Sequence, residues 1–116
     1  MSAARALAAA EVRDAAPLFA ALGDETRVRL LVRLSRNGPE SIAGLRANSP
    51  MSRQAITKHL TVLSKAGLVR DHRRGRERIW SLEQGRLAAA RAYLDRISRQ
   101  WDEALGRLQA HVEGRT

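Results

Sequence analysis

The sequence predicts a mainly α-helical protein with one small β-hairpin and a long C-terminal helix. Residues 51–69 repeat apolar residues at helical spacing, residues 68–82 place apolar residues around a charged turn, and residues 83–113 repeat apolar residues in heptads. With 116 residues we expect a single domain. Its expected parts are an Ala-rich N-terminal helix or arm (1–16), a core (17–82) and a C-terminal helix (83–116).

The net charge favours a polyanionic partner. Lys and Arg number 21 against 12 Asp and Glu, which gives a formal net charge of +9. Nucleic acid is the first candidate and an anionic membrane surface is the second. Aromatic residues make up only 3% of the chain, which is little for the exposed platforms on which single-stranded bases stack. Double-stranded DNA is therefore the favoured partner.

The absence of cysteine removes disulfides, thiolate metal sites and thiol redox chemistry, and it leaves a cytoplasmic setting as the default. Charged residues interrupt the Ala-rich opening, so this segment lacks the apolar core of a secretory signal. No stretch is long enough to span a bilayer. We therefore expect a cytoplasmic protein with no membrane partner.

Three helices are expected before residue 50. The Ala-rich residues before Pro17 favour a helix that Gly23 ends. Asp24 is expected to cap a second helix and Ser41 a short third one. The second helix is expected to direct four apolar residues inward, namely Val28, Leu31, Val32 and Leu34. Its arginines are expected to form a solvated rim, namely Arg27, Arg29, Arg33 and Arg36.

The helix expected after a turn at residues 48–50 has two distinct sides. Ser52 suits the N-cap, and Gly67 suits a left-handed residue after the C-terminus. The apolar side carries Ile56, Leu60 and Leu63, and the polar side carries Gln54, Thr57, Lys58, Thr61 and Lys65. Such polar groups reach base edges and phosphates in a major groove, although this stretch alone also fits a solvated amphipathic helix. Together with the preceding helix it forms a helix-turn-helix candidate.

Residues 68–82 are expected to form a β-hairpin that turns at Arg74-Gly75. Besides His72, the hairpin carries five arginines, namely Arg70, Arg73, Arg74, Arg76 and Arg78. Holding so many like charges together costs stability unless an anion neutralises them. We therefore favour a phosphate or minor-groove contact over a solvated charge run.

Residues 83–113 are expected to form one helix of roughly 40 Å, at about 1.5 Å per residue. Its apolar residues follow two heptad series with two flanking positions: Leu87, Leu94, Trp101 and Leu108; Ala90, Ile97, Ala104 and His111; and Leu105 with Val112. A small core cannot cover this length, so the surplus apolar stripe favours a second copy of the chain. Packing against the first helix is the alternative, and both arrangements can coexist.

Three motifs occur in order along the chain: LGDETR at residues 22–27, MSRQAITKHL at 51–60, and AGLV at 66–69 with RGR at 74–76. In these motifs the chain resembles the ArsR-type family of winged helix-turn-helix transcriptional repressors. The resemblance implies a homodimer whose terminal helices form the interface. It also implies that a recognition helix from each subunit enters successive major grooves of a palindromic operator, so that the protein occludes a promoter.

The resemblance also implies which residues contact DNA. On the recognition helix they are Ser52, Arg53, Gln54, Thr57, Lys58 and His59, and in the wing they are Arg73, Arg74 and Arg76. By their hydrogen-bonding groups, Gln54 suits adenine and Arg53 suits guanine. The dimer interface is expected at Leu87, Leu94, Ile97, Trp101, Leu105 and Leu108 on the C-terminal dimerisation helix.

The chain departs from the metal-sensing members of that family. It has no cysteine pair, and its last helix offers only His111, whereas zinc ligation needs more nitrogen donors. The resemblance therefore implies a regulator without a metal or cofactor, whose inducing signal is unknown. A pocket for an unidentified small-molecule effector would be expected at the dimer interface, near Tyr93 or Trp101.

Two other functions compete with this interpretation. One is a winged-helix module that uses its charge on an acidic protein and reads no DNA sequence. The other, an enzyme, is not expected, because the chain has no Cys nucleophile and no Gly-rich phosphate loop. The carboxylates at residues 24–25 and 102–103 are sequence neighbours whose helical side chains diverge, so they cannot flank one substrate.

Overall fold

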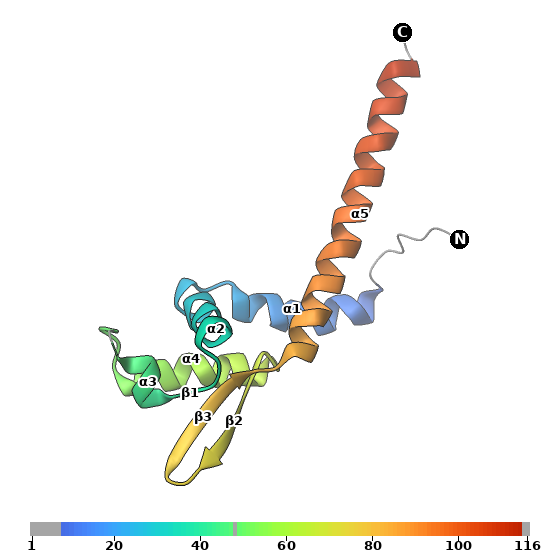
Figure 1. Cartoon of the computed structure of the whole chain (residues 1–116). Helices are drawn as coiled ribbons and strands as arrows, with labels where there is room; N and C mark the ends of the chain where they lie inside the picture. The colour runs from blue at the N-terminus through green and yellow to red at the C-terminus, as the bar shows by residue number, and fades with distance from the viewer. Residues whose placement is uncertain (1–7, 48, 115–116) are drawn as a thin grey trace.

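Five helices and three short strands follow one another in residues 8–47 and 49–114, the part of the chain that the computed structural model describes (Figure 1). The helices are α1 (Ala9–Leu22), α2 (Glu25–Asn37), α3 (Ile42–Arg46), α4 (Arg53–Lys65) and α5 (Gln84–Gly114). The strands are β1 (Glu40–Ser41), β2 (Val69–Arg74) and β3 (Glu77–Leu82). The predicted fold class, mainly α with a small hairpin and a long last helix, is confirmed.

Side-chain caps begin α2 and α3 where the sequence predicts them. The Arg27 backbone N–H donates to Asp24 Oδ1 at 3.0 Å, and the Gly44 backbone N–H donates to Ser41 Oγ at 3.1 Å. Helix α1 continues through Pro17 to Leu22, so the expected boundary between residues 16 and 17 falls inside one helix. Residues 1–7 of the expected arm, and Asn48 of the expected turn, lie outside the described residues.

The inward side of α2 differs from the expectation. Leu30, Leu31 and Leu34 are buried, whereas Val28 and Val32 are 40% and 43% exposed. The apolar residues of α2 occupy a wider part of the helix surface than the core covers. The longer leucine side chains are the ones that the core buries. Residues 28 and 32 lie one helical turn apart, so both valines fall together on the uncovered flank.

Two of the four α2 arginines are not part of a solvated rim. Arg27 Nε donates to the Ala21 carbonyl at 2.7 Å, at the end of α1. Arg33 forms a two-point ion pair with Glu40 and donates to three carbonyls around the end of α3. The last carbonyls of a helix have no partner within it, and these guanidinium groups supply one. Arg29 and Arg36 are exposed as expected.

The predicted hairpin forms part of a three-stranded antiparallel sheet with strand order β1-β3-β2. Arg74 pairs with Glu77, so the turn falls at Gly75-Arg76, one residue later than predicted. Gly75 takes φ +66°, a conformation that costs glycine nothing. The short strand β1 pairs Glu40 with Trp80 and was not expected, since two residues carry no alternation to detect.

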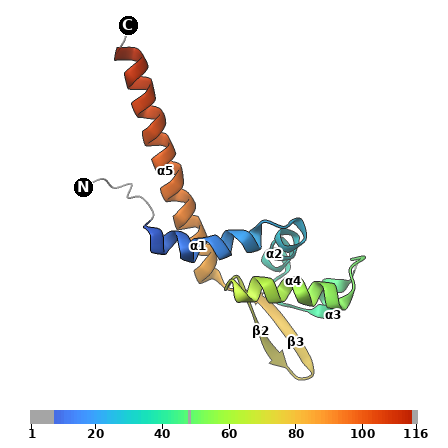
Figure 2. The same ribbon diagram turned by 180° about the vertical axis from the view of Figure 1, so that it is seen from behind.

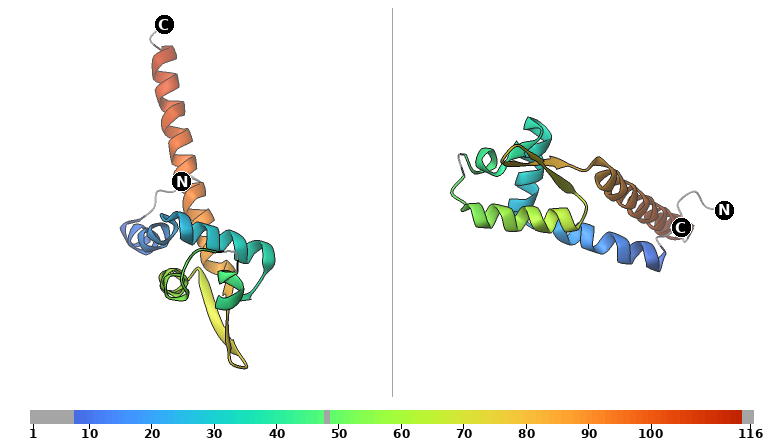
Figure 3. Two further views of the ribbon diagram at one scale, coloured as in Figure 1. Left: turned by 90° about the vertical axis from the view of Figure 1, so that its left-hand side faces the viewer. Right: turned by 90° about the horizontal axis from the view of Figure 1, so that it is seen from below.

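The core lies where α1 to α4 meet the base of the sheet, and its fully buried side chains are Leu18, Leu45, Ile56, Leu60, Leu63, Leu68 and Trp80. Seen from behind, α1 and α4 lie in front of the rest of the core (Figure 2). The view from below also places these two helices on the same side of the molecule (Figure 3). The hairpin tip projects away from this core, as predicted.

Helix α5 begins against the core and then extends beyond it, so the molecule measures 69 × 27 × 21 Å (Figure 1). Ala90 and Tyr93 are its buried residues, and Tyr93 meets Phe19 of α1 edge to face at 6.5 Å between ring centroids. Helix α1 therefore packs across only the lower part of α5. No helix of the described chain combines the length and the apolar character needed to cross a membrane.

Candidate nucleic-acid interface

Helix α4 is fixed at both ends by the residues that the sequence predicts. Ser52 Oγ accepts the Ala55 backbone N–H at 3.1 Å. At the other end Gly67 takes φ +80°, and the Leu68 N–H donates back to the Leu63 carbonyl at 2.9 Å. This 6→1 bond, with a 2.9 Å bond from the Gly67 N–H to the Ser64 carbonyl, forms a Schellman motif. The ends of the helix are therefore set by local bonds.

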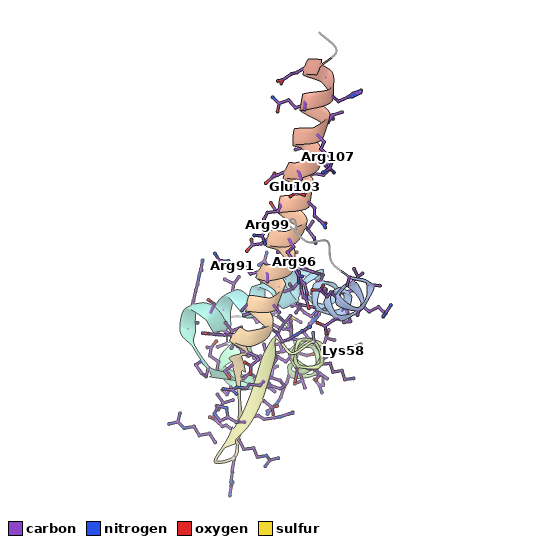
Figure 4. All side chains as sticks on the ribbon, turned by 90° about the vertical axis from the view of Figure 1, so that its right-hand side faces the viewer. Lys58, Arg91, Arg96, Arg99, Glu103 and Arg107 are labelled. Carbon is purple, nitrogen blue, oxygen red and sulfur yellow. The ribbon has the colours of Figure 1, made fainter. Side chains whose placement is uncertain are left out.

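The two sides of α4 are as predicted. Its inward residues, Ile56, Leu60 and Leu63, are at most 1% exposed. Its outward residues line a shallow hollow of about 430 Å³, formed by Arg53, Gln54, Thr57 and Lys58. Thr57 Oγ1 donates to the Arg53 carbonyl at 2.8 Å, which fixes its rotamer and leaves its lone pairs outward. Lys58 points outward from α4 in Figure 4.

His59 is the one predicted recognition-helix residue that lies apart from the others. Its Nδ1 is 3.9 Å from Asp24 Oδ1 and 3.5 Å from an Arg27 Nη, at the start of α2. Its side chain is 23% exposed. The geometry gives His59 a contact inside the protein, and a DNA contact by this residue stays a prediction.

Asp24 therefore serves α2 and α4 together. The hydrogen bond from the Arg27 backbone N–H, aided by the charges of Arg27 and His59, holds the pKa of Asp24 below its ordinary value against some desolvation. A carboxylate with a lowered native pKa stabilises the fold above its unfolded pKa of about 3.9, and this stabilisation is lost as the pH falls through the native pKa.

We expect Asp24→Asn to reduce stability near neutral pH, because asparagine keeps the cap but loses the charge. The gap in urea midpoint between this variant and the wild-type chain should close as the pH falls below the lowered native pKa of Asp24, where both side chains are uncharged. Glu25→Gln, one residue along in an exposed ion pair, is the control for loss of one carboxylate. A gap that persists in acid would contradict the role of the charge.

The wing arginines divide into two groups. Arg78 pairs with Asp71 and lies 5.0 Å from the centroid of the buried Trp80 ring, and Arg70 lies 3.6 Å from Glu83. Within the described part of the chain, no ion pair is found for the three tip arginines, Arg73, Arg74 and Arg76, and all three are exposed. The unneutralised charge therefore gathers at the tip, at the three wing positions that the resemblance implies.

Arg53 connects the helix surface to the wing. It lines a hollow of about 230 Å³ with Arg76 and Arg78, and a second hollow of about 330 Å³ with Arg46 of α3. A concave basic surface therefore runs from α3 past the start of α4 to the hairpin. Arg46 is not among the DNA contacts expected from the sequence, because a lone basic residue in the last turn of a short helix carries no pattern of its own.

The expected dimer residues of α5 differ in their surroundings. Leu87 is half-buried against the core. Leu94, Ile97, Trp101, Leu105, Leu108 and Val112, the exposed stripe, are between 44% and 65% exposed. No group of three or more His, Asp or Glu side chains in the described chain lies close enough to share a metal ion.

A helix-turn-helix pair followed directly by a basic hairpin, with the outward side of its second helix free, defines a winged helix-turn-helix DNA-binding protein. A family model described as bacterial regulatory protein, arsR family, matches residues 24–71. The HTH-type transcriptional regulator Rv2034 of Mycobacterium tuberculosis is 41% identical over 85 residues, which are 73% of this chain and 76% of that protein. The chain belongs to the arsR family of bacterial transcriptional regulators.

Solved structures agree with this assignment. An ArsR-like transcriptional regulator from Rhodococcus sp. RHA1 superimposes with a TM-score of 0.83 at 35% identity, over 93% of this chain and 98% of that one. The AntR antimony-specific transcriptional repressor gives a TM-score of 0.63 at 28% identity, over 84% and 90% of the two chains. The family consists of DNA-binding regulators and not of enzymes, so the resemblance noted in the sequence is confirmed.

Proposed function

We propose that this regulator is a homodimeric repressor that binds a palindromic operator and occludes a promoter. The observation that carries the proposal is the exposed stripe of α5, which extends from a DNA-binding core and is covered by no other part of the described chain. A stripe of this kind is buried most simply by the same stripe of a second copy. The role of AntR as a repressor supports the direction of regulation.

In this proposal the core of residues 17–82 reads DNA and residues 83–116 hold the dimer together. Two recognition helices related by a two-fold axis would enter major grooves roughly 34–36 Å apart. Gln54 and Arg53 contact base edges, since amide and guanidinium groups pair with two base atoms at once. Ser52, Thr57, Lys58 and the wing tip contact phosphates, and Arg46 adds a phosphate contact from α3.

Substitution of a base-reading residue should change the sequence preference of DNA binding, whereas substitution of a phosphate contact should change the affinity for every duplex. Gln54→Ala should reduce the preference for the selected duplex over a scrambled one by about 1–3 kcal/mol. Arg74→Ala should weaken binding to both duplexes alike and reduce the salt slope by about one. Arg36→Ala, which removes the same charge from the exposed side of α2, is the control for net charge.

Fluorescence anisotropy across a salt series measures both effects. Equal losses for Gln54→Ala on the selected and scrambled duplexes would show that Gln54 does not read bases. The duplex itself comes from selection out of a random pool, and selection of genomic fragments then identifies the regulated promoter. If the wild-type chain enriches no sequence at moderate salt, the alternative of a protein-binding winged helix is favoured.

A further inference from the structure

Arg86, in the first turn of α5, bonds to two other parts of the fold at once. Its Nη1 donates to Asp14 Oδ2 at 3.2 Å and its Nη2 to the Asp14 carbonyl at 3.4 Å, both on α1. Its Nε donates to the carbonyl of Ala66 at 3.4 Å, the C-cap of the recognition helix α4. One guanidinium thus joins the helix that carries the exposed stripe, its packing partner and the helix that faces DNA.

The α1 side of this contact is held firmly. The hydroxyl of Tyr93, which is 8% exposed, donates to the same Asp14 Oδ2 at 2.6 Å. This hydrogen bond, followed by the contact with Arg86, lowers the pKa of Asp14. Arg96 lies 5.5 Å from the Tyr93 ring centroid and forms an ion pair with Glu11 at 2.6 Å. Asp14 therefore presents a charged, oriented carboxylate to Arg86.

The α4 side depends on a glycine. The aliphatic stem of Arg86 lies so close to Gly67 that a Cβ there would be 2.7 Å from Arg86 Cγ. Gly67 also supplies the positive φ that ends α4. The residue that turns the chain out of the recognition helix is thus the residue that admits Arg86.

We infer that Arg86 is a positioning residue, which couples the packing of α1 and α5 to the orientation of the recognition helix on DNA. The inference rests on the proposed sequence-specific binding. Arg86 is 31% exposed and lies at the opposite end of α4 from Arg53, so it acts through the C-cap. Its effect is on fit rather than on charge: without the Arg86 contact, α4 keeps its local C-terminal bonds and its polar groups, but its orientation against α1 and α5 is less tightly fixed.

The test compares Arg86→Ala and Arg86→Lys with Arg91→Ala, an exposed arginine of the same helix (Figure 4). We expect the ratio of affinities for the selected and scrambled duplexes to fall by about 5- to 20-fold in both Arg86 variants. Lysine should fail to rescue, because one ammonium group cannot hold Asp14 and Ala66 together. Arg91→Ala should leave the ratio unchanged, and the dimer should persist in sedimentation for all three variants.

A second measurement needs no DNA. In Arg86→Ala, hydrogen exchange of the Gly67 and Leu68 amides should accelerate, while the amides of Leu30 and Leu31 should not change. A double-mutant cycle of Asp14→Ala with Arg86→Ala should show non-additive losses in the duplex ratio.

The outcomes separate the inference from the proposed function. If the ratio of affinities for the selected and scrambled duplexes is unchanged in both Arg86 variants, the inference is overturned. It is also overturned if both affinities fall equally as the thermal midpoint falls, because that result marks a purely structural role. If the wild-type chain itself prefers no duplex, the proposed function has failed, and amide exchange at the C-cap alone then decides the coupling: unchanged rates refute it.

Discussion

Trp101→Asp should convert the proposed dimer into monomers and lower the affinity for the selected duplex by about 100-fold or more. In a dimer, binding of one recognition helix raises the effective concentration of the second at its half-site. Trp101 is 65% exposed in the monomer and lies in the middle of the exposed stripe. A buried tryptophan is often the residue on which an interface depends most. A carboxylate at its position would be buried without a partner when two stripes meet.

Ala110→Asp provides the matched control for this change. Ala110 is exposed and lies nine residues after Trp101, which at 3.6 residues per turn places it on the opposite side of α5. The same charge on that side should leave both dimerisation and DNA affinity intact. Sedimentation at micromolar concentration measures the first quantity, and anisotropy measures the second. If Trp101→Asp, or a chain ending before Leu94, still sediments as a dimer, the exposed stripe is not the interface.

Most of the fold follows from local chemistry. Asp24, Ser41 and Ser52 cap helices because their oxygens accept nearby backbone N–H groups, and Gly67 ends one because it adopts a positive φ at no cost. These bonds lie within a few residues of the chain, so the sequence alone predicts them. The hairpin turn is displaced by one residue, because its register depends on a buried tryptophan paired with Asp71, and sequence spacing does not show that partner.

The site was less predictable than the fold. Helical periodicity correctly divides α4 into a core side and a free side, but His59 borders the core side, and only the packing of α2 decides that it meets Asp24. The same limit applies to Arg27 and Arg86. Each binds a carbonyl at the end of another helix, Arg27 that of Ala21 and Arg86 that of Ala66, and no pattern of residue types shows which carbonyls come within reach.

The largest effect on stability is expected at Arg33. Its Nε and Nη2 bond both carboxylate oxygens of Glu40 at 3.0 and 3.3 Å, and its Nη groups donate to the carbonyls of Gly44, Leu45 and Ala47 at 2.6, 3.3 and 3.2 Å. The side chain thus ties α2 to β1 and to the end of α3. Removing it leaves the Glu40 carboxylate, whose side chain is only 17% exposed, without its partner, and takes one donor from each of three carbonyls, so Arg33→Ala should cost about 2–4 kcal/mol of unfolding free energy.

Arg33→Lys should recover less than half of that loss, since one ammonium group cannot reach Glu40 and the carbonyls in the fork geometry of a guanidinium. Arg29→Ala is the control from the same helix. Arg29 pairs with Glu25 at 2.7 Å, but both side chains are about 80% exposed, and exposed pairs contribute at most about 1 kcal/mol. Chemical denaturation compares the three variants. Equal losses at positions 29 and 33 would mean that the contacts of Arg33 with Glu40 and the three carbonyls add nothing beyond an exposed ion pair.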